Sequence, residues 1–129
     1  EELVNKAAKL VEGLGLHFQI SKLAAADCSH SMARTYDVEI WIPSMGIYKE
    51  VSSASNARDY QARRGMIRYR DKETGKTKFC HTLNASGLAT SRLFPALLEQ
   101  NQQKDGSVII PDALVPFMGG IKVLYPKKK

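Results

Sequence analysis

The stretch TYDVEIWIPSMGIYKEVSS, residues 35–53, decides the fold because it predicts two strands joined by a tight turn. Polar and apolar residues alternate along its first half, the pattern of a strand with one buried face. The PSMG sequence at residues 43–46 then supplies turn residues. On the returning segment, the same alternation places Tyr48, Glu50 and Ser52 on one side. The stretch therefore predicts a β-hairpin.

Outward from this hairpin, helical and extended patterns follow each other along the whole chain. Apolar residues recur at helical spacing, or the composition favours a helix, in three segments: 2–14, 55–65 and 88–103. Strand patterns and turns predict a strand at 16–23, a second hairpin at 66–84 turning at Gly75, and a short strand and brief helix within 105–120. Two antiparallel pairs in succession favour an α+β fold, with an antiparallel β-sheet flanked by helices.

Composition is that of one globular domain with a basic surface. The chain has 129 residues, of which 43% are hydrophobic and 25% charged, and its net charge is +6. This charge favours polyanionic partners such as nucleotides or RNA, although the terminal lysines 127–129 are expected to be a solvated tail. We expect no membrane span and no signal segment, and two cysteines fit a reducing compartment. A soluble protein of the cytoplasm, or of an organellar matrix, is therefore predicted.

Two polar sets are candidates for chemistry. Cys28, His30, Cys80 and His81 are conceivable zinc ligands, but neither pair has the spacing of a structural zinc site, which disfavours this interpretation. The second set lies at predicted strand ends and at the start of the last long helix: Glu50, Ser52, Ser53, Asn84, Ser86 and Arg92.

This second set fits phosphate chemistry. A carboxylate can hold Mg²⁺, hydroxyl and amide groups can hold a small polar substrate, and an arginine can grip a phosphate through two parallel hydrogen bonds. The common nucleotide and hydrolase motifs, such as GxxxxGK[ST] and GxSxG, are absent from the sequence. From the residues alone, a solvated strand carboxylate and an ordinary surface arginine remain the commoner alternatives.

Two long stretches carry a resemblance to a known family. TYDVEIWIPSMGIYKEVSSASNARDYQARR, residues 35–64, and HTLNASGLATSRLFPALLEQNQQKDGSVIIPDALVPFMGG, residues 81–120, resemble the C-terminal part of the catalytic domain of seryl-tRNA synthetase. The second stretch is similar to the third signature motif of class II aminoacyl-tRNA synthetases. The resemblance implies that residues 1–129 are a partial class II catalytic core with an antiparallel sheet. It also implies a serine–tRNA ligase that uses ATP, L-serine, the serine tRNA and Mg²⁺, as a homodimer.

The resemblance also implies roles for individual residues. Glu50 and Ser53 would hold Mg²⁺ within an ATP-binding segment formed by Glu50, Val51, Ser52 and Ser53. Arg92 would clamp the γ-phosphate, so that Arg92 and Glu50 are the expected catalytic residues. Asn84 and Ser86 would contact serine. Other residues in the matching stretches are expected to be structural: Asp37, Trp41, Arg63 and Arg64.

Parts of the family pattern do not occur in this sequence. The N-terminal tRNA-binding arm, the first motif, and the second motif with its α-phosphate arginine are expected upstream of residue 1, and the glutamate for serine's amino group is missing. We therefore expect the chain alone to be inactive. Two alternatives stay open: a synthetase-like paralogue that acts as an interaction or regulatory module, and a small basic RNA-binding protein. The latter is disfavoured because the sequence shows no platform of aromatic and basic residues.

Overall fold

A computed structural model describes residues 1–127 of the chain. Of the three lysines expected to form a solvated tail, Lys127 is exposed, and residues 128 and 129 lie outside the described residues. Among the described residues, no helix combines the length and the apolar character needed to cross a membrane.

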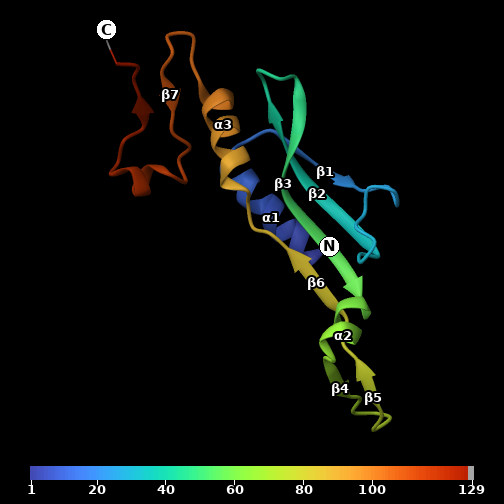
Figure 1. The fold of residues 1–129 in the computed structure, drawn as a ribbon. Helices are drawn as coiled ribbons and strands as arrows, with labels where there is room; N and C mark the ends of the chain where they lie inside the picture. The colour runs from blue at the N-terminus through green and yellow to red at the C-terminus, as the bar shows by residue number, and fades with distance from the viewer. Residues whose placement is uncertain (128–129) are drawn as a thin grey trace.

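Three helices, one 3₁₀ helix and eight strands make up the described residues (Figure 1). In chain order they are α1 (Glu2–Gly13), β1 (Phe18–Lys22), β2 (Arg34–Ile42), β3 (Ile47–Arg58), α2 (Tyr60–Gly65), β4 (Arg68–Arg70), β5 (Thr77–Phe79), β6 (Thr82–Ala85), α3 (Thr90–Asn101), β7 (Val108–Ile109), η1 (Val115–Met118) and β8 (Val123–Leu124).

A four-stranded antiparallel sheet in the order β1-β2-β3-β6 forms the centre of the fold. Val38 and Ile40 of β2 are fully buried and belong to one core cluster with Val11 of α1 and Leu97 of α3. Both long helices therefore pack on the same, apolar face of the sheet, where removing their apolar stripes from water stabilises the fold. The predicted hairpin at 35–53 and the predicted α+β class agree with this arrangement.

A β-bulge at Val51 changes the faces of β3. Val38 pairs with Ser52 and the next residue, Glu39, pairs with Glu50, so Val51 has no partner on β2. An extra residue reverses the alternation that follows it. The prediction that Ser52 shares a side with Glu50 is therefore wrong. Ser52 is buried on the core face opposite Val38, and Ser53 takes its place on the side of Glu50.

Other predicted boundaries also move, for tertiary reasons. The helix expected at 55–65 begins only at Tyr60, because residues 54–58 continue β3 and pair with β6. The second hairpin is the short β4–β5 pair, since residues 82–85 leave it to join the main sheet. Pro95 lies inside α3, in its second turn. The buried Ala96 and Leu97 beside Pro95 anchor the helix and offset the hydrogen bond that proline cannot make.

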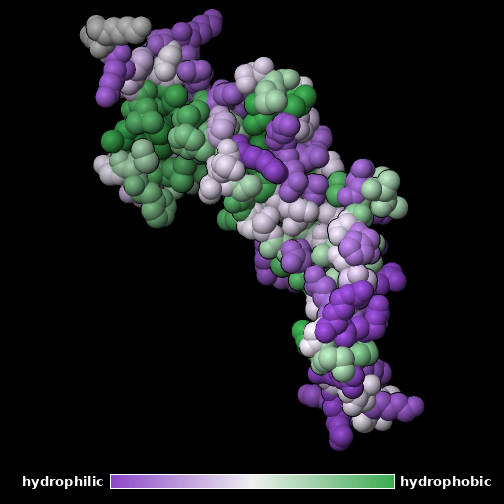
Figure 2. All heavy atoms as spheres, in the orientation of Figure 1, coloured by the Kyte–Doolittle hydropathy of each residue, from purple (hydrophilic) through white to green (hydrophobic). Residues whose placement is uncertain are grey.

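The two ends of the molecule differ in character (Figures 1 and 2). Beyond the C-terminal side of β3, α2 and the β4–β5 hairpin project from the sheet as an arm, which we define as residues 58–81 and call the basic arm. At the opposite end, the small β7–β8 sheet and η1 carry an apolar surface. Its exposed members include Ile109, Phe117, Met118, Ile121, Leu124 and Tyr125.

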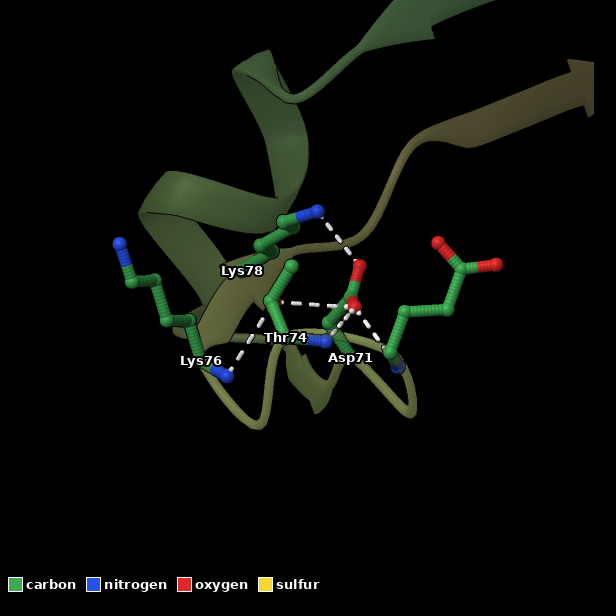
Figure 3. A network of polar contacts seen from close by, with 5 residues as sticks. Asp71, Thr74, Lys76 and Lys78 are labelled. Carbon is green, nitrogen blue, oxygen red and sulfur yellow. Dashed lines mark hydrogen bonds and ion pairs between the residues drawn. The ribbon is translucent and has the colours of Figure 1, made fainter.

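A polar network around Asp71 orders the tip of the basic arm (Figure 3). Asp71 Oδ1 accepts hydrogen bonds from the backbone nitrogens of Glu73 and Thr74, at 3.1 and 2.8 Å, and from the Thr74 hydroxyl at 3.0 Å. Asp71 Oδ2 accepts from Lys78 Nζ at 2.5 Å. These donors, above all the Lys78 ammonium, lower the pKa of Asp71 from 3.8 to about 2.

We expect the arm tip to lose its order only in strong acid. Because the pKa of Asp71 is lower in the folded chain than in the unfolded one, its stabilisation is fully present above about pH 4 and is lost as the pH falls towards 2. The amide chemical shifts of Glu73 and Thr74 should therefore titrate with a midpoint near pH 2. The Asp71→Asn variant should lose that titration. A midpoint near 3.8 in the unmodified chain would show that the network does not form in solution.

Candidate functional site

The face of the sheet opposite α1 and α3 is polar. Paired residues of neighbouring antiparallel strands point to the same side, so the strand register defines this face. Thr35 Oγ1 lies 2.8 Å from Ser55 Oγ, and Glu39 Oε2 accepts hydrogen bonds from both Gln19 and Ser21 at 2.7 Å. We call it the polar face, and its members are Gln19, Ser21, Thr35, Asp37, Glu39, Trp41, Tyr48, Glu50, Ser53, Ser55 and Asn84.

Arg92 meets Glu50 at the edge of this face. Arg92 lies in the first turn of α3, and its Nη1 donates a hydrogen bond to the Glu50 carbonyl oxygen at 2.8 Å. The same nitrogen lies 3.5 Å from Glu50 Oε2, while the side chains of Arg92 and Glu50 are 50% and 43% exposed. The backbone contact holds the guanidinium in place, and both charged groups remain accessible to a ligand.

A run of hydrogen bonds fastens the segment 86–92 to residues 50–53. Each residue from Glu50 to Ser53 takes part in at least one of them. The pairs are Arg92 Nη1 to Glu50 O at 2.8 Å, Ala89 N to Val51 O at 2.6 Å, Ser52 Oγ to Ser86 O at 2.8 Å, Ser86 N to Ser53 O at 3.3 Å, and Ser53 N to Ser86 Oγ at 3.3 Å. Two segments that are far apart in the sequence therefore form one hydrogen-bonded unit.

The predicted site residues divide into accessible and buried ones. Glu50 and Ser53 lie on the polar face, and Asn84 is exposed there opposite Ser55. The side chains of Val51 and Ser52 are buried, so these two residues present no side chain to a ligand. Ser86 lies at the junction with β3. Ser86 and Arg92 each form hydrogen bonds with β3, and among the described residues no hydrogen bond links the two to each other.

Asp37, for which the sequence predicts a structural role, is an additional candidate. Asp37 is only 7% exposed, and its Oδ1 has no hydrogen-bond partner among the described residues. On the polar face, Asp37 is paired in register with Ser21 on one side and Ser53 on the other. A buried polar atom without a partner is costly. Asp37 therefore has unused capacity to accept a hydrogen bond beside Ser53.

The donor set fits a magnesium ion that arrives with phosphate oxygens. Mg²⁺ in nucleotide sites is held by one or two carboxylates together with substrate phosphates and water. Glu50 offers an accessible carboxylate, and Ser53 adds a hydroxyl on the same face. Within residues 1–127, no group of three or more His, Cys, Asp or Glu side chains forms a metal site by itself. Of the conceivable zinc ligands, His30 contacts the Tyr60 hydroxyl at 3.1 Å instead.

Known proteins resemble this chain in sequence. Residues 1–101 match the family model of the tRNA synthetase class II core domain (G, H, P, S and T). A protein of Clostridium acetobutylicum named serine–tRNA ligase 2 is 68% identical over 123 residues, which are 95% of this chain and 29% of that protein. A serine–tRNA ligase of Cellvibrio japonicus is 52% identical over the full 129 residues, or 30% of its length. The chain thus spans less than a third of these curated relatives.

Solved structures resemble it in fold. The crystal structure of seryl-tRNA synthetase from Pyrococcus horikoshii complexed with ATP superposes with a TM-score of 0.91 at 38% identity, over 98% of this chain and 28% of that one. The cytoplasmic serine–tRNA ligase of Naegleria fowleri in complex with AMP superposes with a TM-score of 0.87 at 32% identity, over 98% and 30%. The predicted resemblance and fold class are confirmed, and the chain belongs to the class II tRNA synthetase core-domain family.

Proposed function

We propose that this chain is the C-terminal part of the catalytic domain of a serine–tRNA ligase. Such an enzyme activates L-serine with ATP to seryl-adenylate and then transfers the seryl group to the serine tRNA. The observation that carries the proposal is the hydrogen bond from Arg92 to the backbone carbonyl of Glu50. This contact places a guanidinium that could bind phosphate beside a carboxylate that could bind a metal ion, at one edge of the polar face.

In this proposal, Arg92 and Glu50 position ATP. A guanidinium has five N–H donors, and the contact with the Glu50 carbonyl uses one of them. The others are free to bind phosphate oxygens and to neutralise charge as pyrophosphate leaves. Glu50 and Ser53 would hold Mg²⁺, which when bound supplies positive charge at the phosphates. Because the side chains of Val51 and Ser52 are buried, these two residues would contribute to the ATP site through their backbone atoms and by supporting the shape of the site.

Asn84 and Ser86 would hold the substrate serine. Asn84 is exposed on the polar face, opposite Ser55, and Ser86 is joined to Ser53 through two hydrogen bonds. An amide and a hydroxyl can donate to and accept from the small polar side chain and carboxylate of serine. Holding serine next to the ATP site would let the protein lower the barrier by positioning, since phosphoryl-type transfer needs little covalent chemistry from the enzyme.

The whole enzyme would be longer than this chain. The matched relatives are about three times as long as the matched region, which supports a longer parent protein. From the family resemblance, we infer that this parent is a homodimer of the cytoplasm or of an organellar matrix. The alternative of a non-catalytic paralogue finds no support in the site, since Glu50, Asn84, Ser86 and Arg92 all occupy accessible positions. Serine with Mg-ATP should raise the melting temperature of the enzyme and would not raise that of such a paralogue.

A chimera tests this proposal directly. In it, residues 1–129 replace the matching segment of the Clostridium acetobutylicum relative. We expect serine-dependent ATP–pyrophosphate exchange and serylation of the serine tRNA within about tenfold of the unmodified relative, because a change of that size is only 1.36 kcal/mol in the barrier. The isolated 129-residue chain should show neither activity. A chimera that folds and binds ATP, but shows no exchange with serine, would contradict the proposal.

A further inference from the structure

The basic arm holds most of the charge of the chain. Residues 58–81 contain eight Lys and Arg against three Asp and Glu, so their net charge is +5 out of +6 for the whole chain. Two of the three acids are already paired, Asp59 with Arg63 and Asp71 with Lys78. Within residues 1–127, six cations of the arm have no ion-pair partner. Two of them, Arg64 and Arg68, lie over aromatic rings, and the other four are Arg58, Arg70, Lys72 and Lys76. Figure 2 shows the hydrophilic surface that results.

The fold also interleaves these cations with aromatic rings. The guanidinium carbon of Arg64 lies 3.6 Å from the centre of the Tyr60 ring, and that of Arg68 lies 4.9 Å from the centre of the Phe79 ring. Tyr69, which directly follows Arg68 in the sequence, is 47% exposed. The sequence alone indicates no platform of aromatic and basic residues. Arg68 and Phe79 are separated in sequence and meet only because β4 pairs with β5, so their contact is a property of the folded chain.

A groove follows this surface. Its volume is about 690 Å³, and its lining combines aromatic, basic and polar side chains: Asp59, Tyr69, Lys78, Phe79, Cys80 and His81. The Asp71 network orders the hairpin turn that carries Lys76 (Figure 3), and Lys72 lies in the same turn, directly after Asp71 in the sequence. A preorganised surface loses less conformational entropy when a ligand binds.

The arm is too far from the ATP site to serve the phosphates of ATP. Glu50 and Arg58 lie near opposite ends of β3, and eight residues of strand at about 3.3 Å each separate them by roughly 26 Å. Unpaired cations on an ordered surface with exposed rings suit a long polyanion, whose phosphates release counterions and whose bases stack on aromatic side chains.

We propose that the basic arm binds the sugar–phosphate backbone of an RNA. Resting on the proposed function, this RNA is the serine tRNA, which the arm contacts at a distance from the site of amino-acid activation. The cations Arg70, Lys72 and Lys76 contact phosphates, and Tyr69 stacks on an unpaired base or on a ribose. Neither the activation of serine nor the binding of ATP depends on these contacts.

Charge reversal of the arm in the chimera is the test. The triple variant Arg70→Glu, Lys72→Glu, Lys76→Glu is compared with Lys9→Glu, Lys22→Glu, Lys104→Glu, which changes the charge equally at exposed positions outside the arm. We expect the arm variant to raise the KM for the serine tRNA by about tenfold or more. The plot of the logarithm of the tRNA association constant against the logarithm of the salt concentration should become less steep, by about 2 to 3 in slope. Serine-dependent pyrophosphate exchange, measured without tRNA, should be unchanged in both variants.

The outcomes separate this inference from the proposed function. If the chimera is active but both variants change the KM for tRNA equally, the arm is not an RNA site, and the ligase assignment stands. If the arm variant leaves the KM unchanged but lowers the melting temperature or dissociates the enzyme, the arm packs against an acidic protein surface, and the inference is wrong. If the unmodified chimera shows no exchange with serine, the ligase assignment fails. Binding of a serine tRNA by the 129-residue chain, measured by fluorescence anisotropy, then decides the RNA proposal alone.

Discussion

Replacing Arg92 with lysine in the chimera is expected to lower kcat/KM for ATP in the exchange reaction by about 10²- to 10³-fold, the range for removing one preorganised donor from a charge-stabilising site. Lysine keeps the positive charge but has a single ammonium, so it cannot contact the Glu50 carbonyl and make a forked pair of hydrogen bonds to phosphate. The Michaelis constant for ATP and the turnover number are measured by serine-dependent pyrophosphate exchange.

A matched control separates the role of Arg92 from a general effect of losing an arginine. Arg34 is also exposed and also pairs with a carboxylate, that of Glu1 at 3.4 Å, but it lies outside the hydrogen-bonded unit of residues 50–53 and 86–92. Arg34→Lys should leave both kinetic constants within about twofold, since exposed ion pairs contribute at most about 1 kcal/mol. If Arg92→Lys also left both constants unchanged, Arg92 would be an ordinary surface arginine.

The strand pattern predicted the sheet, because alternation in β2 reports directly which residues are buried. Val38, Ile40 and Ile42 are all in the core, as the period of two requires. The bulge at Val51 could not be predicted in the same way. Its cause is tertiary, since the Val51 carbonyl accepts from Ala89 and the Ser52 hydroxyl donates to Ser86, both outside the hairpin. Which serine lies beside Glu50 on the polar face therefore depends on contacts between residues that are distant in the sequence.

The same reasoning applies to the candidate site. The residues alone favour an ordinary surface arginine at position 92, and the resemblance to a family implies that it contacts a phosphate. The geometry adds the physical reason, since the Glu50 carbonyl holds the guanidinium beside the Glu50 carboxylate. The sequence does not indicate the free acceptor atom of Asp37 or the stacked cations of the basic arm, for a related reason. A carboxylate without a partner, and a cation stacked on a ring from another strand, are properties of the packed chain and have no local pattern.

Replacing Glu50 with glutamine is expected to lower kcat for pyrophosphate exchange by roughly 10²-fold and to raise the Mg²⁺ concentration needed for half-maximal rate. Charge stabilisation by a bound metal is worth several kcal/mol, and each 1.36 kcal/mol is about tenfold in rate. Glutamine has nearly the size of glutamate, and Arg92 donates to the backbone carbonyl of residue 50, so the contact that positions Arg92 survives. The melting temperature should change little, because the Arg92–Glu50 ion pair is half-exposed.

Glu39→Gln is the matched control, because it separates loss of a metal ligand from loss of negative charge on the polar face. Glu39 lies beside Glu50 in the strand register and on the same polar face, but its Oε2 already accepts hydrogen bonds from Gln19 and Ser21. If the general negative charge of the face attracted Mg²⁺, both variants would shift the Mg²⁺ dependence equally. A shift confined to Glu50→Gln identifies a metal ligand, because only that carboxylate lies at the edge where Arg92 would hold phosphate. Equal shifts, or none, would remove Glu50 from the magnesium site.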